Sequence, residues 1–98
     1  MAAYMIVICK VRDRARFLAE YGAPTAKLIA EFGGEYVLRA PGGVSLEGGL
    51  GEGASAVISK WPNRAAIDAF WTSPAYEKLK AVRQPLADAQ VMVVEEPG

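Results

Sequence analysis

The sequence predicts an α+β fold of the ferredoxin-like type, with strands and helices in the order βαββαβ in one domain over residues 1–98. Two observations predict it. Short segments rich in β-branched residues alternate with segments whose apolar residues recur at helical spacing. No internal repeat or linker divides the 98 residues, a length typical of one domain. Right-handed crossovers then place the helices on one face of a four-stranded antiparallel sheet.

The first predicted strand is Tyr4 to Val11, because this segment is short and rich in β-branched residues. Both of its alternating sets of side chains are apolar. Asp13 is the predicted N-cap of the helix that follows. Pro24 lies within this helix, lacks an N–H and clashes with the carbonyl four residues earlier, so we expect a kink or a break between residues 21 and 25.

The middle of the chain contains two further predicted strands and a glycine-rich connection. Gly33-Gly34 ends the first helix, and Glu35 to Ala40 is the second strand. Residues 41–53 contain six glycines and a proline, which predicts a loop or an irregular hairpin, with Ser45 to Glu47 as an optional short strand. Ala54 to Trp61 is the third strand.

The last third of the chain predicts two short helices and a closing strand. Asn63 caps a helix whose buried stripe contains Ile67, Phe70 and Trp71. Ser73-Pro74 ends that helix and starts another, since proline is favoured at a first helical position. Gln90 to Glu95 is the closing strand and is again apolar on both faces.

The open face of this sheet predicts self-association. A sheet that faces water on one side should carry polar residues at alternate positions, and the first and last strands do not. Each additional buried aliphatic side chain contributes roughly 1.5–3 kcal/mol. We therefore expect a homodimer in which the two sheets pack against each other. We expect Ser55, Val57, Ser59 and Trp61 to face the partner sheet, and Ala56, Ile58 and Lys60 to lie beneath a helix.

Several classes of function are disfavoured by composition. The chain has no histidine, which removes histidine-ligated metal and haem and the Ser-His-Asp and Cys-His mechanisms. Its one cysteine, Cys9, is expected to be an inert core thiol, and it cannot form an intramolecular disulfide, which fits a reducing cytoplasm. We expect no metal and no cofactor.

Charge and hydropathy argue against large charged partners. Eleven basic and eleven acidic side chains cancel, so there is no bulk electrostatic reason to bind nucleic acid or an anionic membrane. The longest apolar run, Tyr4 to Cys9, is six residues, whereas a membrane span needs roughly 20. No signal peptide is visible, and we expect a cytoplasmic protein.

The glycine-rich segment is not interpreted as a nucleotide site. Gly49, Gly51 and Ala54 fit a permissive G-x-G-x-x-A pattern, but this pattern must open a helix so that phosphate meets free N–H groups. Here the pattern leads into a strand, and we interpret the segment as a flexible hairpin.

The candidate site residues are polar groups and aromatic rings near the third strand and the helices after it. Such an aromatic cluster usually belongs to the hydrophobic core, and in a minority of proteins it also lines a ligand pocket. Glu47 is the only candidate base, although a solvated acid is the simpler account of it. Arg83 is a candidate anion partner, although it also suits a helix C-terminus. The candidate ligand-binding residues, expected between the two sheets, are Arg39, Glu47, Ser59, Trp61, Trp71, Tyr76 and Arg83.

Several short motifs carry a resemblance to a known family. They are Ala3-Tyr4-Met5-Ile6, Phe32-Gly33-Gly34-Glu35-Tyr36, Leu46-Glu47-Gly48, Trp61-Pro62-Asn63, the stretch from Ala69 to Tyr76, and Arg83. The chain resembles domain-of-unknown-function family 1330, a family of small bacterial proteins. The resemblance implies a dimeric α/β barrel built from two ferredoxin-like units. It implies no particular activity.

Two classes of function remain open, and the sequence does not decide whether the protein is an enzyme. The first is a cofactor-free protein that binds or converts a small aromatic or carboxylic compound, with Glu47 as candidate base. The superfamily implied by the resemblance includes cofactor-independent monooxygenases and isomerases. The second is a non-catalytic stress-response or interaction module whose interior is solidly packed.

Overall fold

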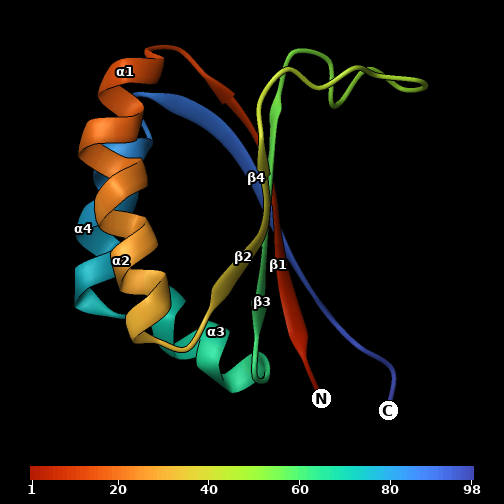
Figure 1. The fold of residues 1–98 in the computed structure, drawn as a ribbon. Helices are drawn as coiled ribbons and strands as arrows, with labels where there is room; N and C mark the ends of the chain where they lie inside the picture. The colour runs from red at the N-terminus through yellow and green to blue at the C-terminus, as the bar shows by residue number, and fades with distance from the viewer.

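The computed structural model describes all residues from 1 to 98, and it contains one antiparallel sheet with the helices on one face (Figure 1). The sheet order is β2-β3-β1-β4. The strands are β1 (Ala3–Val11), β2 (Glu35–Ala40), β3 (Ser55–Trp61) and β4 (Ala87–Glu95). The predicted βαββαβ order is confirmed.

Strand β1 is central and pairs with β3 on one side and β4 on the other. Ile6 lies opposite Ile58 of β3 and Met92 of β4. The closing strand begins at Ala87 rather than at the predicted Gln90, because residues 87–89 continue the pairing with the end of β1.

The first helical segment is continuous through Pro24. It consists of α1 (Arg14–Phe17), a π-helical turn (Leu18–Gly22) and α2 (Ala23–Glu31). Asp13 caps α1, as predicted. The kink or break expected at the proline is instead a wider helical turn just before it. Hydrogen bonding five residues back accommodates the irregularity without ending the helix.

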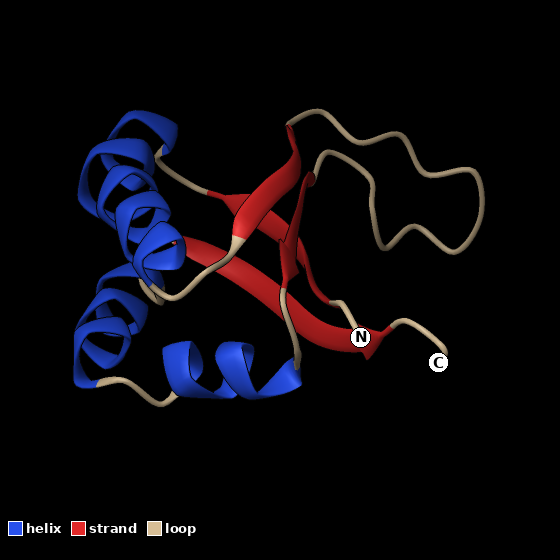
Figure 2. Cartoon of the chain, turned by 60° about the horizontal axis from the view of Figure 1, so that its bottom comes forward, coloured by secondary structure: helices blue, strands red, loops and turns tan.

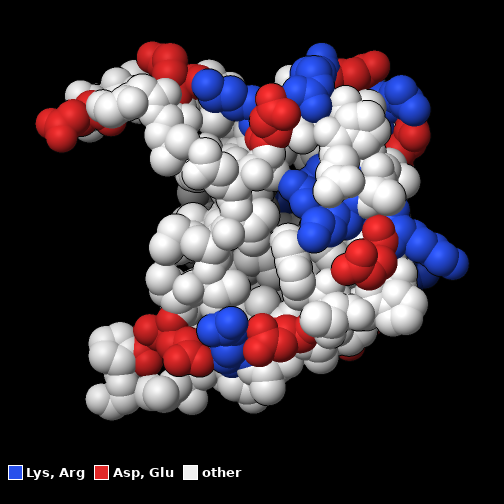
Figure 3. Space-filling model, turned by 180° about the vertical axis from the view of Figure 1, so that it is seen from behind, with Lys and Arg blue, Asp and Glu red and all other residues white.

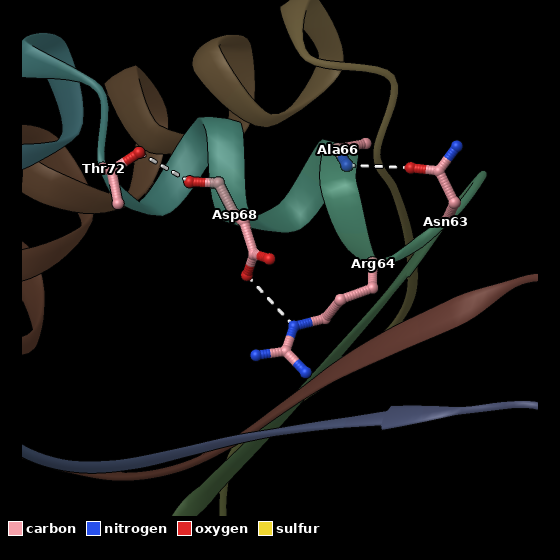
Figure 4. Close-up of polar contacts among 5 residues, drawn as sticks. All are labelled: Asn63, Arg64, Ala66, Asp68 and Thr72. Atoms are coloured by element: carbon pink, nitrogen blue, oxygen red, sulfur yellow. Dashed lines mark hydrogen bonds and ion pairs between the residues drawn. The ribbon is translucent and has the colours of Figure 1, made fainter.

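The second helical segment on this face begins with α3 (Arg64–Trp71), which is stabilised locally by side chains that follow β3 (Figure 4). The Asn63 carboxamide oxygen accepts a hydrogen bond from the Ala66 backbone N–H at 2.9 Å, which confirms the predicted cap. Arg64 and Asp68 form an exposed ion pair at 3.0 Å.

Helix α4 (Pro74–Arg83) follows after a sharp corner, as predicted. The Ser73 hydroxyl accepts from the Tyr76 backbone N–H at 3.1 Å, and Pro74 occupies the start of the helix. This geometry turns Tyr76 and Arg83, both buried, toward the sheet.

The most tightly packed part of the core lies where α3 meets the end of β3. Trp61, Ile67 and Phe70 are the largest fully buried side chains. The Trp61 and Phe70 ring centroids are 5.2 Å apart. Gly34 lies directly against this cluster, since a Cβ atom at this position would come within 2.7 Å of the Trp61 ring.

The prediction for the two faces of β3 is wrong. Ser59 and Trp61 are 2% and 1% exposed and lie on the face covered by helices. The Trp61 indole N–H donates to the Ser59 hydroxyl at 2.8 Å, so the serine is satisfied inside the core. Ala56, Ile58 and Lys60 alternate with this set and lie on the open face instead.

The open face of the sheet is largely apolar at its centre. Leu38, Met92 and Val94 are 43%, 54% and 39% exposed. Figure 3 shows this side in profile, at the left, as a hollow of uncharged side chains between the loop above and the two chain ends below. None of the helices is long and apolar enough to cross a membrane.

Residues 41–53 form a loop that projects beyond the sheet, away from the helices (Figures 1 and 2). The optional strand at Ser45 to Glu47 does not form. Leu46 is 98% exposed at this loop.

Candidate ligand-binding site

A cavity of about 370 Å³ lies between the helix-facing side of the sheet and the helices α1, α2 and α4. Of its 22 lining residues, 15 are hydrophobic. The cavity lies within one chain, on the face of the sheet opposite to the one where a site between two sheets was expected. It exists because the inner positions at this end of the sheet carry small side chains, including Cys9, Ser55 and Val57.

The helices above the cavity also contribute to its volume. The π-helical turn places Leu18, Tyr21 and Gly22 in the cavity wall. A π-helical turn within an α-helix is rare and is frequently found at functional sites. The missing side chain at Gly22 keeps this part of the wall thin.

An aromatic wall closes the cavity toward the packed core. The Tyr76 ring lies 4.5 Å from the Phe70 ring and 5.1 Å from the Trp71 ring, measured between centroids. The hydroxyls of Tyr21 and Tyr76 are hydrogen-bonded to each other at 2.9 Å. Burial, together with the neighbouring Tyr76, raises the pKa of Tyr21, so the Tyr21 phenol remains a neutral hydrogen-bonding group near neutral pH.

Two polar atoms of the lining are buried without a hydrogen-bond partner. They are the Nε of Arg83 and the Oγ1 of Thr25, on residues that are 7% and 4% exposed. Thr25 nevertheless lies close enough to Tyr21 to lower its pKa slightly, against the effect of burial. Most buried polar atoms in proteins have a partner, so these two atoms are the buried polar groups of the cavity that are available to bind a ligand.

The mouth of the cavity carries two exposed arginines. The Arg39 guanidinium lies 4.2 Å from the centroid of the Tyr36 ring. Burial raises the pKa of Tyr36, and the neighbouring Arg39 acts in the opposite direction. Arg14 donates to the Ser55 hydroxyl at 3.5 Å, a long contact. Cationic groups therefore surround the opening.

A second, more open groove of about 510 Å³ lies beside the cavity. Trp71, Arg83 and Val91 line both spaces. The rest of the groove is more polar and includes Lys80 and Asp88. Arg83 therefore lies where an apolar cavity and a polar groove meet.

Five of the seven predicted site residues are brought together here. Arg39, Ser59, Trp71, Tyr76 and Arg83 all line the cavity.

The two other predicted residues lie elsewhere. Trp61 lies in the packed core, behind the cavity lining, where it contacts Ser59 and Phe70. Glu47 is exposed on the projecting loop and is not part of the cavity lining.

The sequence did not predict that residues of the first helical segment would line the cavity. Tyr21 falls on an apolar helical stripe, which is typical of core residues, and Thr25 carries no distinctive motif. The only sequence feature that pointed to this region was Pro24. It predicted an irregular helix, and the irregular part of the helix forms a wall of the cavity.

Cys9 also lines the cavity, and burial raises the pKa of its thiol. A raised pKa makes a thiol unreactive near neutral pH. The structure contains no cluster of three or more His, Cys, Asp or Glu side chains able to hold a metal ion.

Comparison with known proteins identifies a family and solved structures that share the fold. A family model described as a domain of unknown function (DUF1330) matches residues 2–97. A comparison with curated proteins finds no similar sequence.

Solved structures share the fold at low identity. A protein of unknown function from Rhodopseudomonas palustris is 19% identical, with a TM-score of 0.78 over 99% of this chain and 83% of its own. A dimeric ferredoxin-like protein of unknown function from a Jannaschia species is 16% identical, with a TM-score of 0.76 over 98% of this chain and all of its own. SnoaB, a cofactor-independent oxygenase from Streptomyces nogalater, is 14% identical, with a TM-score of 0.73 over 99% of this chain and 94% of its own.

Proposed function

The chain belongs to the DUF1330 family, and from this premise and the cavity we propose that it binds one small aromatic or carboxylic compound per chain. The observation that carries the proposal is the cavity itself. Its volume of about 370 Å³ falls in the range of ligand pockets, roughly 300–1,000 Å³. Its mostly apolar walls with a few convergent polar groups are also typical of such pockets.

The cavity is too large to be an ordinary packing defect. The space opens to solvent at its mouth and at the polar groove, so water can enter it. We therefore infer that water occupies it in the free protein and that a ligand displaces this water.

The first experiment is a screen of thermal stability against a few hundred metabolites. A ligand that binds only the folded state raises the melting temperature by mass action. The matched control is Val57→Phe, which fills part of the cavity from its floor. We expect at least one aromatic or carboxylic compound to stabilise the wild type and to have no effect on the variant. The absence of any stabilising compound would contradict the proposal.

We also propose that the protein is a homodimer in which the open faces of two sheets pack together. The support is the partly buried Ile6, Ile8 and Ile58 at the centre of a face that also exposes Met92 and Val94. Light scattering should give twice the chain mass of 10.5 kDa at micromolar concentration. Ile58→Lys should give a monomer, and a wild-type monomer would contradict the proposal.

A second candidate function is a cofactor-independent oxygenase, as SnoaB is described. The observation that favours it is the pair of Tyr21 and Tyr76 hydroxyls beside the Arg83 cation in an apolar space, which could bind a phenolate. An isomerase is less well supported, because Glu47 lies outside the cavity and no acidic side chain lines it.

The oxygenase function has a direct test. Oxidation of 1-naphthol to 1,4-naphthoquinone consumes one O2 and releases one water, so an oxygen electrode and quinone absorbance should report equal amounts. Oxygen uptake that is lost in Arg83→Met would support this function. If the protein consumes oxygen no faster than buffer alone, the oxygenase function is contradicted and the binding function remains. The alternative of a module with a solidly packed interior is disfavoured by the cavity.

A further inference from the structure

Arg83 is a buried cation without a counter-ion. The chain contains three ion pairs, Arg12–Asp88, Arg16–Glu20 and Arg64–Asp68, and Arg83 takes part in none of them. Its Nε has no hydrogen-bond partner, and the residue is 7% exposed. A buried charge that lacks a partner is costly, so proteins rarely keep one without a use.

The charges around the cavity are all of one sign. Its lining includes Arg14, Arg39 and Arg83 and no aspartate or glutamate. Arg14 and Arg39 are exposed at the mouth, whereas Arg83 is inside. A concave surface lined by one sign of charge concentrates ligands of the opposite sign.

The position of Arg83 explains how a charged group could enter an apolar interior. The guanidinium lies where the cavity joins the polar groove, so an anion on Arg83 can keep water on its other side. The one acid in the groove, Asp88, is exposed and paired with Arg12 at 2.9 Å, and therefore does not neutralise Arg83. Complete dehydration, the main cost of burying a charge, is avoided.

The apolar part of the cavity is suited to a ring. Six aromatic side chains contribute to its wall: Phe17, Tyr21, Tyr36, Phe70, Trp71 and Tyr76. Aromatic rings favour tilted and edge-to-face contacts with each other beyond the effect of buried area.

We propose that the ligand is an aromatic monoanion, such as an aryl carboxylate, with its ring in the cavity and its anionic group on Arg83 at the junction with the groove. This assignment rests on the proposed binding function and narrows it. One buried cation matches one negative charge. The arginines at the mouth attract the anion, and Arg83 holds it.

The experiment is calorimetric titration with matched pairs of probes that differ in charge: benzoate with benzamide, and 2-naphthoate with 2-naphthamide. We expect wild-type protein to bind each carboxylate at least tenfold more tightly than its amide. Arg83→Met should bind carboxylate and amide equally, with the affinity for the amide within threefold of the wild type. Arg64→Met removes an exposed arginine outside the cavity and should behave like the wild type.

The possible outcomes separate the two proposals. Equal binding of carboxylate and amide by the wild type overturns the anion assignment and leaves the binding function in place. A preference for the carboxylate that survives in Arg83→Met also overturns the assignment. Failure of every probe and every screened metabolite to bind overturns both.

Two further measurements keep the test decisive if Arg83→Met affects folding. Without ligand, Arg83→Met should melt at the same or a higher temperature than the wild type, because an unpaired buried charge has been removed. A fall in melting temperature would indicate a structural role instead. Arg83→Lys keeps the charge but loses the Nε donor, so it should retain a weakened preference for the carboxylate, and a complete loss of binding to both probes would contradict the assignment.

Discussion

The two ends of the interface between sheet and helices are packed in opposite ways. At the end beneath α3, Trp61, Ile67 and Phe70 are almost completely buried. At the end beneath the π-helical turn, a cavity of about 370 Å³ remains. We call these the packed end and the hollow end. Both lie against the same central strands, so the difference arises from the size of the side chains and from the helical cover, which contains the π-helical turn only at the hollow end.

This difference shows how a small domain can combine stability with an internal site. The packed end concentrates large rings in a small volume, where each buried ring contributes strongly. At the hollow end, the inward-facing positions of the sheet include the small residues Cys9 and Ser55. The hollow end can therefore vary in shape and chemistry while the packed end maintains the fold.

The largest expected effect is the loss of a ring at the packed end. Trp61→Ala should reduce the free energy of unfolding by about 3–5 kcal/mol, because it removes a fully buried side chain and leaves a cavity. Urea denaturation followed by circular dichroism measures this. Val57→Ala at the hollow end should cost less than half as much, and equal losses would contradict the distinction between the two ends.

A smaller effect is expected from adding one methyl group at the packed end. In Gly34→Ala the new Cβ would lie 2.7 Å from Ile29 Cγ2 and 2.7 Å from Trp61 Cε2, and both side chains are buried. Overpacking of this kind costs about 1–3 kcal/mol. The measurement is the midpoint of urea denaturation at constant slope. An unchanged midpoint would show that the packed end can rearrange.

The hollow end should respond to alkaline pH through Tyr21. Its pKa is raised by burial in the folded state, so the unfolded chain ionises first, above about pH 10. Stability is therefore complete below pH 10 and falls as the pH rises, by up to about 1.4 kcal/mol per pH unit for this group. Tyr21→Phe should show a shallower fall between pH 9 and 11 in urea denaturation. Identical profiles would indicate that Tyr21 ionises as freely in the folded protein as in the unfolded chain.

The smallest expected effect has the opposite sign. Gly22 has helical backbone angles (φ −60°, ψ −51°), and an added Cβ would approach Leu18 Cδ2 at an ordinary 3.4 Å. Gly22→Ala should therefore raise stability by about 0.5–1 kcal/mol, because alanine loses less backbone entropy in a helix. Paired with Gly34→Ala, this variant tests whether the same substitution changes sign between the two ends. A loss of stability in both variants would contradict that expectation.

Most of the fold could be predicted from local patterns. The strands carry β-branched runs, and helices α1, α3 and α4 start at the capping side chains Asp13, Asn63 and Ser73. These signals are local because capping hydrogen bonds span only a few residues. Of the kink or break expected between residues 21 and 25, the break does not form, because a wider helical turn can accommodate a proline without ending the helix.

The site was predicted in composition but not in location. Both alternating sets of β1 are apolar and β3 has no charged residue before Lys60, so hydropathy did not identify the face that meets the helices. In the structure, Ser59 lies on the face that meets the helices. Its hydroxyl accepts a hydrogen bond from the Trp61 indole N–H, and this bond offsets the cost of burying the hydroxyl. Glu47 was selected for its chemistry alone, and only the path of the loop shows that it lies outside the cavity.

The chain ends meet at the sheet, and this has a consequence for how the protein can be cut and rejoined. The Glu96 backbone N–H donates to the Ala2 carbonyl at 2.9 Å, so a short peptide could link residues 2 and 96. If the chain were opened in the exposed loop at residues 41–53, the permuted protein would begin at β3 and would again have the order βαββαβ. The molecule is thus composed of two βαβ halves, and either half can come first.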